Sequence, residues 1–196
     1  MSDDTNTGGS ERLVEMFGAR SPTSVDDLTL VRERERATVN EFLEQRHPLG
    51  SVPGWKACFS ARYADCIVAV VVLGRPVARQ ADDGTELSIT RFCRRDDRPD
   101  NTGSWLIARA RKWAELEGFD TLSAHAGVAG NYGTVYEAAG FDCAKVDVAD
   151  GSGWTNRDGR SEWDDYERRK WIYQLKDDRN QRYVDADTDR PRGDGA

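Results

Sequence analysis

The chain has 196 residues and a formal net charge of −7 at neutral pH, and 38% of its residues are hydrophobic. At this length we expect one domain with one hydrophobic core. Its longest apolar run, residues 67–73, is far shorter than the roughly 20 residues that cross a bilayer, and its polar N-terminus is unlike a secretion signal. We therefore expect a cytoplasmic protein, neither inserted in a membrane nor exported.

The charged residues are unusual in kind. Arg outnumbers Lys 23 to 5, and Asp outnumbers Glu 23 to 12. Surfaces rich in Asp and poor in Lys remain hydrated at high salt, which favours a salt-adapted, halophilic protein. A GC-rich genome would also enrich Arg over Lys, so both explanations stay open. The acidic balance does not point to nucleic acid, although a local arginine patch would still bind it.

The chain divides into three parts. We expect residues 1–24 to be a flexible N-terminal segment, residues 25–176 to be the folded domain, and residues 177–196 to be a disordered acidic tail. The hydrophobic pattern predicts strands at 28–31, 55–61, 66–73, 86–93, 121–125, 141–148 and 170–175, and helices at 33–46, 103–117 and 132–139. Their order predicts a single α/β domain, with a mixed central sheet and helices on both faces.

The cysteines and histidines do not form a metal-binding pattern. No two cysteines have CxxC spacing, and the chain has only two histidines, so we predict no metal site. Each cysteine has apolar neighbours, and we expect all four to be reduced core residues; they are Cys58, Cys66, Cys93 and Cys143. We also expect His125 to be packed inside its strand.

The segment that joins the third long strand to the main helix is the most informative part of the chain. Residues 98–105 form a turn of small and polar residues that opens the helix. Backbone N–H groups converge at such a turn, and the positive end of the helix dipole lies behind them, which suits a phosphate or pyrophosphate. The alternative is that Asn101, Thr102 or Ser104 only caps the helix.

A second motif follows the next strand, in residues 131–141. With both motifs the chain resembles the GNAT acyltransferase family, whose members use acyl-coenzyme A. The family binds the pyrophosphate with an arginine or glutamine, two residues, a glycine, one residue, and a glycine or alanine. Arg98, Asn101 and Gly103 occupy those places, with Asn101 replacing the first glycine. The family's later asparagine, tyrosine and Gly-Phe pair are matched by Asn131, Tyr136 and residues 140–141, and the resemblance covers about residues 25–176.

The resemblance implies acetyl-CoA, or another acyl-CoA, as the cofactor. The strand end would offer backbone groups to the pantetheine arm, and the turn would hold the pyrophosphate. The residues implied for the coenzyme are Phe92, Cys93, Arg98, Asn101, Thr102, Gly103, Ser104, Trp105 and Asn131. Tyr136 has the family's position for the acid that protonates the departing thiolate, and a phenol suits that task. The alternative is that Tyr136 packs its helix against the sheet.

The proton acceptor for the attacking amine has three candidates. Glu86 has suitable chemistry but lies at the start of its strand, away from the reacting carbon. His47, which precedes a loop rich in Pro and Gly, is the second, and a relaying water is the third.

Several residues also resemble a narrower phage and prophage branch of GNAT-like proteins, related to the Mom enzymes that modify adenine in DNA. The resemblance lies in residues 74–79, 82–84, 90–91 and 101–104 and in His47. The chain departs from the branch at Ser88, where a glutamate is usual, and this departure weakens the expectation of a base on that strand. In this interpretation Arg75, Arg79 and Arg91 contact the substrate, including DNA phosphates. The alternative is that these arginines pair with nearby aspartates.

Three functions follow. The first is an acyl-CoA-dependent N-acetyltransferase acting on a small-molecule or nucleic-acid amine. The second is a Mom-like DNA adenine modification enzyme. The third is a GNAT-fold protein that binds a ligand without catalysis, which the loss of the usual glutamate at Ser88 keeps open.

Overall fold

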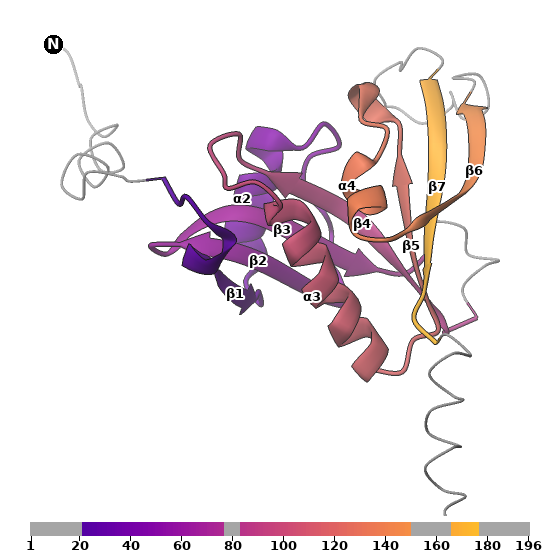
Figure 1. Ribbon diagram of the computed structural model, residues 1–196, viewed down its shortest axis with the longest axis horizontal. Helices are drawn as coiled ribbons and strands as arrows, with labels where there is room; N and C mark the ends of the chain where they lie inside the picture. Colours follow the sequence, from indigo (N-terminus) through magenta and orange to yellow (C-terminus); the bar gives the residue numbers. More distant parts are fainter. Residues whose placement is uncertain (1–20, 77–82, 150–165, 177–196) are drawn as a thin grey trace, which may run out of the picture.

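A seven-stranded mixed sheet forms the centre of the computed structural model, which describes residues 21–76, 83–149 and 166–176 (Figure 1). The strands lie in the order β1-β2-β3-β4-β5-β7-β6, and only β4 and β5 run parallel. They are β1 (Thr29–Arg32), β2 (Ala57–Tyr63), β3 (Cys66–Gly74), β4 (Glu86–Arg94), β5 (Thr121–Ala126), β6 (Asp142–Ala149) and β7 (Tyr166–Gln174). The predicted α/β class and mixed sheet are confirmed.

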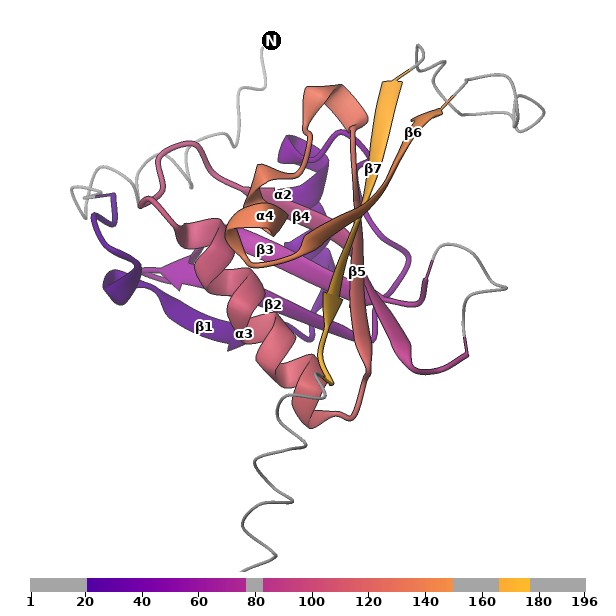
Figure 2. The same cartoon turned by 45° about the vertical axis from the view of Figure 1, so that its right-hand side comes forward.

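The helices cover both faces of the sheet, as predicted. They are α2 (Arg36–Arg46), α3 (Thr102–Leu116) and α4 (Thr134–Ala138), with two 3-10 turns, η1 (Val25–Asp27) and η3 (Val128–Gly130). Alternate residues of a strand face opposite sides. Phe59 of β2 packs in the cluster that contains α3, whereas its neighbour Cys58 packs with α2. Figures 1 and 2 show α3 in front of the sheet and α2 behind it.

Most element boundaries lie within two residues of the predicted ones, and two differ by three residues or more. Helix α2 begins at Arg36 and not at residue 33, because Glu33 is buried and its carboxylate accepts hydrogen bonds from Arg62 and Ser60. Strand β7 begins at Tyr166, four residues before the predicted start, and pairs with β6 from that residue onward. The charged residues at its beginning carry no hydrophobic pattern, so the pairing with β6 was missed.

The 3-10 turn η1 lies at the predicted start of the folded domain. Ser24 caps η1 with its side chain, and its backbone N–H donates to the carboxylate of Asp27 at 3.0 Å. The expected flexibility of residues 1–20 and of the tail 177–196 lies outside the described residues.

The prediction of four core cysteines is wrong for two of them. Cys58 and Cys93 are buried, but Cys66 and Cys143 are exposed, one next to the β2–β3 turn and the other on the edge strand β6. The prediction for His125 is also wrong, because its side chain is exposed. Residues on the outer strands alternate between core and solvent, and the sequence does not reveal which face of a strand is covered.

Two further observations concern the described residues only. They include no group of three or more His, Cys, Asp or Glu side chains placed to hold a metal ion. None of their helices is long and apolar enough to span a membrane.

Candidate functional site

Strands β4 and β5 separate part of the way along their length. Their pairing runs from Glu86 opposite Thr121 to Ile89 opposite Ala124, and residues 90–94 of β4 have no partner on β5. A β-bulge lies at the same place, because Val72 of β3 pairs with Arg91 whereas its neighbour pairs with Ile89. A bulge bends its strand and increases its twist. Residues 90–94 of β4, which include the predicted coenzyme contacts Phe92 and Cys93, therefore have a strand edge toward β5 that β5 does not cover.

The N-terminus of α3 lies beyond the free end of β4. Thr102 is buried and its hydroxyl donates to the carbonyl of Pro99 at 2.7 Å, while the hydroxyl of Ser104 donates to the carbonyl of Asn101 at 3.1 Å. The backbone N–H groups of Gly103 and Ser104 make no hydrogen bond to any described residue. Neither hydroxyl caps the helix, so these amides remain available to an anion.

The backbone conformation at residue 101 shows why an asparagine can stand where the resembling family has a glycine. Its backbone has φ 63° and ψ 2°, the left-handed conformation, and it precedes the first residue of α3. Glycine adopts this conformation freely, and asparagine tolerates it better than most residues. Asn101 can therefore occupy the glycine position without changing the backbone.

Arginines surround this helix end. Burial lowers the pKa of Arg94, and the positive charge of Arg98 lowers it further. Arg98 donates to the carbonyls of Arg95 and Asp96 at 3.1 and 3.0 Å, so it shapes the turn as well as charging it. Arg95 pairs with Asp97. The positive field of Arg94 and Arg98 adds to that of the helix dipole.

Helix α4 packs against the same end of α3. A Cβ atom on Gly103 would lie 2.5 Å from Val135 and 3.1 Å from Phe92, so only glycine allows this close approach. Figures 1 and 2 show α4 beside the opening between β4 and β5. Tyr136 follows Val135, and its ring packs against Phe92, which also lies close to Gly103.

Tyr136 is 6% exposed and lies within an aromatic cluster. Its ring centroid is 5.7 Å from that of Phe141, 6.5 Å from that of Phe92 and 6.5 Å from that of Trp171. Its hydroxyl makes no hydrogen bond within the described part of the chain, and burial raises its pKa. Packing and catalysis are compatible here, because the ring fills the core while the hydroxyl stays protonated and without a partner.

The two candidate bases, Glu86 and His47, lie on different elements of the structure. Glu86 lies at the first pair of the β4–β5 ladder, three residues before the strands part, and its carboxylate is 3.8 Å from the ammonium of Lys170. His47 ends α2, and its Nδ1 accepts a hydrogen bond from the N–H of Leu49 at 3.1 Å. Burial, together with the charge of Arg91, lowers the pKa of His47 to about 4. His47 is therefore neutral at pH 7, but it is a weak base.

Of the three arginines proposed for the substrate, the structure describes Arg75 and Arg91. Arg91 donates to the carbonyls of Leu49, Gly50 and Ser51 at 3.2–3.4 Å, and it thus holds the loop after α2. Arg75 is exposed at the end of β3, and Arg79 lies outside the described residues. To contact a phosphate, the Arg91 guanidinium would have to give up some of these hydrogen bonds to the loop.

Asn131 and Trp105 serve local structure. The Asn131 side chain accepts a hydrogen bond from the N–H of Gly133 at 3.1 Å, which shapes the turn before α4. The Trp105 ring packs against the core and stacks under the guanidinium of Arg109, 3.7 Å from the ring centroid. Cys93 is buried on the α2 side, so a coenzyme contact at this position would be made by its backbone.

Sequence reasoning missed two residues of this region. A guanidinium nitrogen of Arg94 lies 3.4 Å from the position of a Cβ atom on Gly103, and no local pattern distinguishes Arg94 from the neighbouring arginines. Trp171 is a buried core residue, and its indole N–H lacks a hydrogen-bond partner in the described chain and lies close to Gly133. Its place in the motif could not be detected, because β7 follows the motif by some thirty residues.

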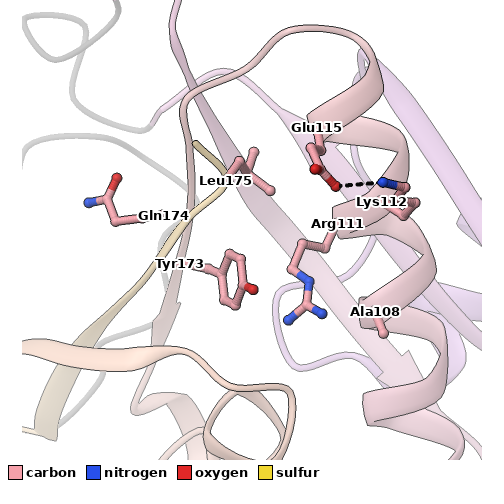
Figure 3. Close-up of a pocket in the computed structure, with 7 residues that line it drawn as sticks. All are labelled: Ala108, Arg111, Lys112, Glu115, Tyr173, Gln174 and Leu175. Atoms are coloured by element: carbon pink, nitrogen blue, oxygen red, sulfur yellow. Dashed lines mark hydrogen bonds and ion pairs between the residues drawn. The ribbon is translucent and has the colours of Figure 1, made fainter. Parts of the chain in front are cut away.

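A cavity of about 350 Å³ lies at the other end of α3 (Figure 3). Its polar groups are engaged with one another: Arg111 stacks on Tyr173 and donates to the carbonyl of Ala139, and Lys112 pairs with Glu115 at 3.0 Å. The cavity is thus separate from the α3 N-terminus and offers no unengaged group comparable to the amides there.

Comparison with known proteins identifies the fold. No family model matches the chain, and no curated protein matches its sequence. Among solved structures, a Bacillus subtilis acetyltransferase in complex with CoA superposes with a TM-score of 0.55 at 16% identity, over 76% of this chain and 99% of that one. The ribosomal-protein-S18-alanine N-acetyltransferase of Escherichia coli gives 0.56 at 13% identity, over 76% and 95%. A Salmonella typhimurium protein solved with its cofactor acetyl-CoA gives 0.57 at 12%, over 77% and 95%. The chain has the GNAT acetyltransferase fold.

Proposed function

We propose that this protein is an acyl-CoA-dependent N-acetyltransferase. The observation that carries the proposal is the convergence of three features at one place. The free edge of β4 leads to the unpaired amides of Gly103 and Ser104, Val135 of α4 packs on Gly103, and Tyr136 packs on Phe92 of β4 with an unpartnered hydroxyl. The GNAT fold, and the CoA and acetyl-CoA in two of the structures with that fold, support this ligand.

The residues present fit the coenzyme. The N–H groups at the N-terminus of α3, with Arg94 and Arg98 beside them, suit a pyrophosphate. The unpaired edge of β4 suits the amide groups of a pantetheine arm, which can add to a sheet as a further strand would. Bound there, acetyl-CoA supplies an activated thioester.

The reaction breaks a C–S and an N–H bond and forms a C–N and an S–H bond. The acceptor nitrogen attacks the thioester carbonyl, the C–N bond forms, the C–S bond breaks, and the nitrogen loses a proton. Tyr136 donates its hydroxyl proton to the departing sulfur, and its phenolate regains a proton from solvent before the next turnover. Because burial raises the pKa of Tyr136, this donor stays protonated throughout the working pH range.

Binding of acetyl-CoA, measured by calorimetry at low and at high salt, is the first test. We expect micromolar affinity for the wild type. A demonstrably folded protein that binds no acetyl-CoA in either condition would refute the proposal.

Turnover is the second test, with Tyr136→Phe against Tyr132→Phe, an exposed tyrosine four residues away. General acid assistance is worth about 10²–10⁴-fold in rate, so Tyr136→Phe should lose this much without losing affinity or stability. The acceptors to try are a peptide with an N-terminal alanine, free aliphatic amines, and adenine-containing DNA, which tests the Mom-like alternative. Released CoA should be measured by chromatography, because the exposed Cys66 and Cys143 would react with thiol reagents.

The same variants test the other hypotheses. The protein could bind acetyl-CoA, turn over no acceptor, and show no effect of Tyr136→Phe. This result would favour a non-catalytic binding protein. A cytoplasmic location also remains a proposal, and the free state of all four cysteines suits a reducing compartment.

A further inference from the structure

Strand β6 is the last strand of the sheet, and one of its two backbone edges has no partner in the described chain. Its only neighbour among the described strands is β7, and Figures 1 and 2 show it at the margin of the sheet. A free strand edge presents unpaired N–H and C=O groups to solvent, where another strand can pair with them. β6 has eight residues and no proline, and after the bulge between Cys143 and Lys145 its ladder with β7 is regular. The edge is therefore suited to receive a further strand.

Two valines of β6 point into solvent on one face. Val146 and Val148 are 54% and 73% exposed, and they lie opposite Arg169 and Glu167 of β7. Trp171, two residues after Arg169 on the same face, is buried in the core that contains α3, so the valines lie on the α3 side of the sheet. Exposed valines cost free energy in water, and a partner that covers them removes that cost.

Two opposite charges lie on the other face of β6, on either side of Val146. Lys145 and Asp147 form an ion pair at 2.8 Å within the strand. In the ladder with β7, Lys145 is opposite Lys170, and Asp147 is opposite Arg168. Like charges on opposite residues destabilise a strand pair. A carboxylate on the outer side of Lys145 would therefore be favourable.

The sequence of β6 is complementary to itself when two copies run antiparallel. A two-fold axis perpendicular to the sheet keeps each residue on its own face, so it passes where one residue lies opposite its own copy. With Val146 at the axis, Lys145 lies opposite Asp147 of the second copy, and the reverse pair forms as well. Val148 then lies opposite Ala144. An axis through either charged residue would instead place that residue opposite its own like charge. Lysine on an edge usually discourages pairing, but this register supplies its counter-charge twice.

We propose that a second copy of this chain docks antiparallel on β6, with the two-fold axis at Val146, so that two seven-stranded sheets become one continuous sheet. Main-chain hydrogen bonds along the edge hold the pair. The valines of the two copies cover each other on the α3 side, and two Lys145–Asp147 pairs between the copies form on the other side. None of these residues belongs to the opening between β4 and β5 or to the N-terminus of α3, so the inference is independent of the proposed acetyltransferase function.

Disulfide crosslinking tests the pairing and its register. The background is the full chain with Cys66→Ser and Cys143→Ser, which removes the exposed thiols. Val146→Cys places two thiols directly opposite each other, where Cβ atoms lie about 4.5–5.5 Å apart, close to the spacing of a disulfide. We expect this variant to form a covalent dimer under mild oxidation.

Val148→Cys is the matched control, because this side chain is the more exposed of the two. Each copy of residue 148 lies two residues from the axis, so the two thiols are about 13 Å apart and should not crosslink. Equal crosslinking of the two variants indicates random collision and overturns the proposal. Failure of Val146→Cys to crosslink overturns it as well.

Sedimentation equilibrium of the full chain tests the charge pairing. Lys145→Asp and Asp147→Lys each place like charges opposite each other twice in a dimer, so each should raise the dissociation constant by about tenfold or more. The double variant exchanges the two charges and should dimerise like the wild type. Unfolding temperatures check that the single variants remain folded, since an exposed ion pair contributes little to stability. A wild type that stays monomeric at its highest soluble concentration, or a double variant as weak as the single ones, would overturn the proposal. Neither experiment requires acetyl-CoA.

Discussion

The contact between α3 and α4 at Gly103 leads to a quantitative prediction for Gly103→Ala. The new Cβ atom would lie 2.5 Å from Cγ2 of Val135, 3.1 Å from Phe92 and 3.4 Å from Arg94. Overpacking of this kind costs about 1–3 kcal/mol. Replacing glycine by alanine in a helix returns roughly 0.5–1 kcal/mol. We therefore expect a net loss of about 1–2 kcal/mol in the free energy of unfolding.

The assay is urea denaturation followed by tryptophan fluorescence. Gly54→Ala is the control, because its φ is not positive and no described atom lies within 4 Å of its Cβ position, so that variant should unfold like the wild type. Val135→Ala removes the methyl groups that clash, and we expect it to cost about 2 kcal/mol alone through lost burial. Combined with Gly103→Ala it should cost at least 1 kcal/mol less than the sum of the two.

Full stability of Gly103→Ala, or strict additivity in the double variant, would refute the packing argument. The prediction also affects how the anion site is tested. A large residue at Gly103 disturbs the packing of α4 before it blocks any coenzyme, so loss of acetyl-CoA binding in such a variant would not identify the loop as the binding site.

Two further variants test local features of the same domain. Because Asn101 has φ 63°, Asn101→Ala should lose about 1 kcal/mol in urea denaturation while Asn101→Gly changes stability by less than half of that, and equal losses would contradict the left-handed assignment. Since the pKa of His47 is about 4 in the folded protein and about 6.5 when unfolded, protonation favours the unfolded chain. The stability from this group is fully present above pH 6.5 and is lost as pH falls toward 4, on the order of 3 kcal/mol. His47→Gln should therefore show a flatter pH profile of unfolding across that window, and parallel profiles for the two proteins would show that His47 is not desolvated.

The sequence alone determined the order of strands and helices and the α/β class. Period-2 and period-3.6 patterns are local, and the longest apolar segments, such as β3 and α3, carry them clearly. The amide site before α3 was also visible, since a turn of small residues between a strand and a helix predicts it. The predicted element boundaries were wrong where tertiary contacts override the local pattern. At Glu33 the carboxylate is buried against Arg62, and the charged start of β7 is a strand because β6 pairs with it.

Only the tertiary structure decided which side chains meet. Ser88 and Ser123 are 35 residues apart in the sequence and become neighbours through the parallel pairing of β4 with β5. Gly103 and Val135 meet because α4 packs on the end of α3, and the loop contacts of Arg91 depend on a segment some forty residues earlier. The sequence also did not show that Cys66, Cys143 and His125 are exposed, because the alternation of residues along a strand does not tell which face is covered. Pairing, register and coverage arise from the whole chain at once, and the chemistry of the site depends on them.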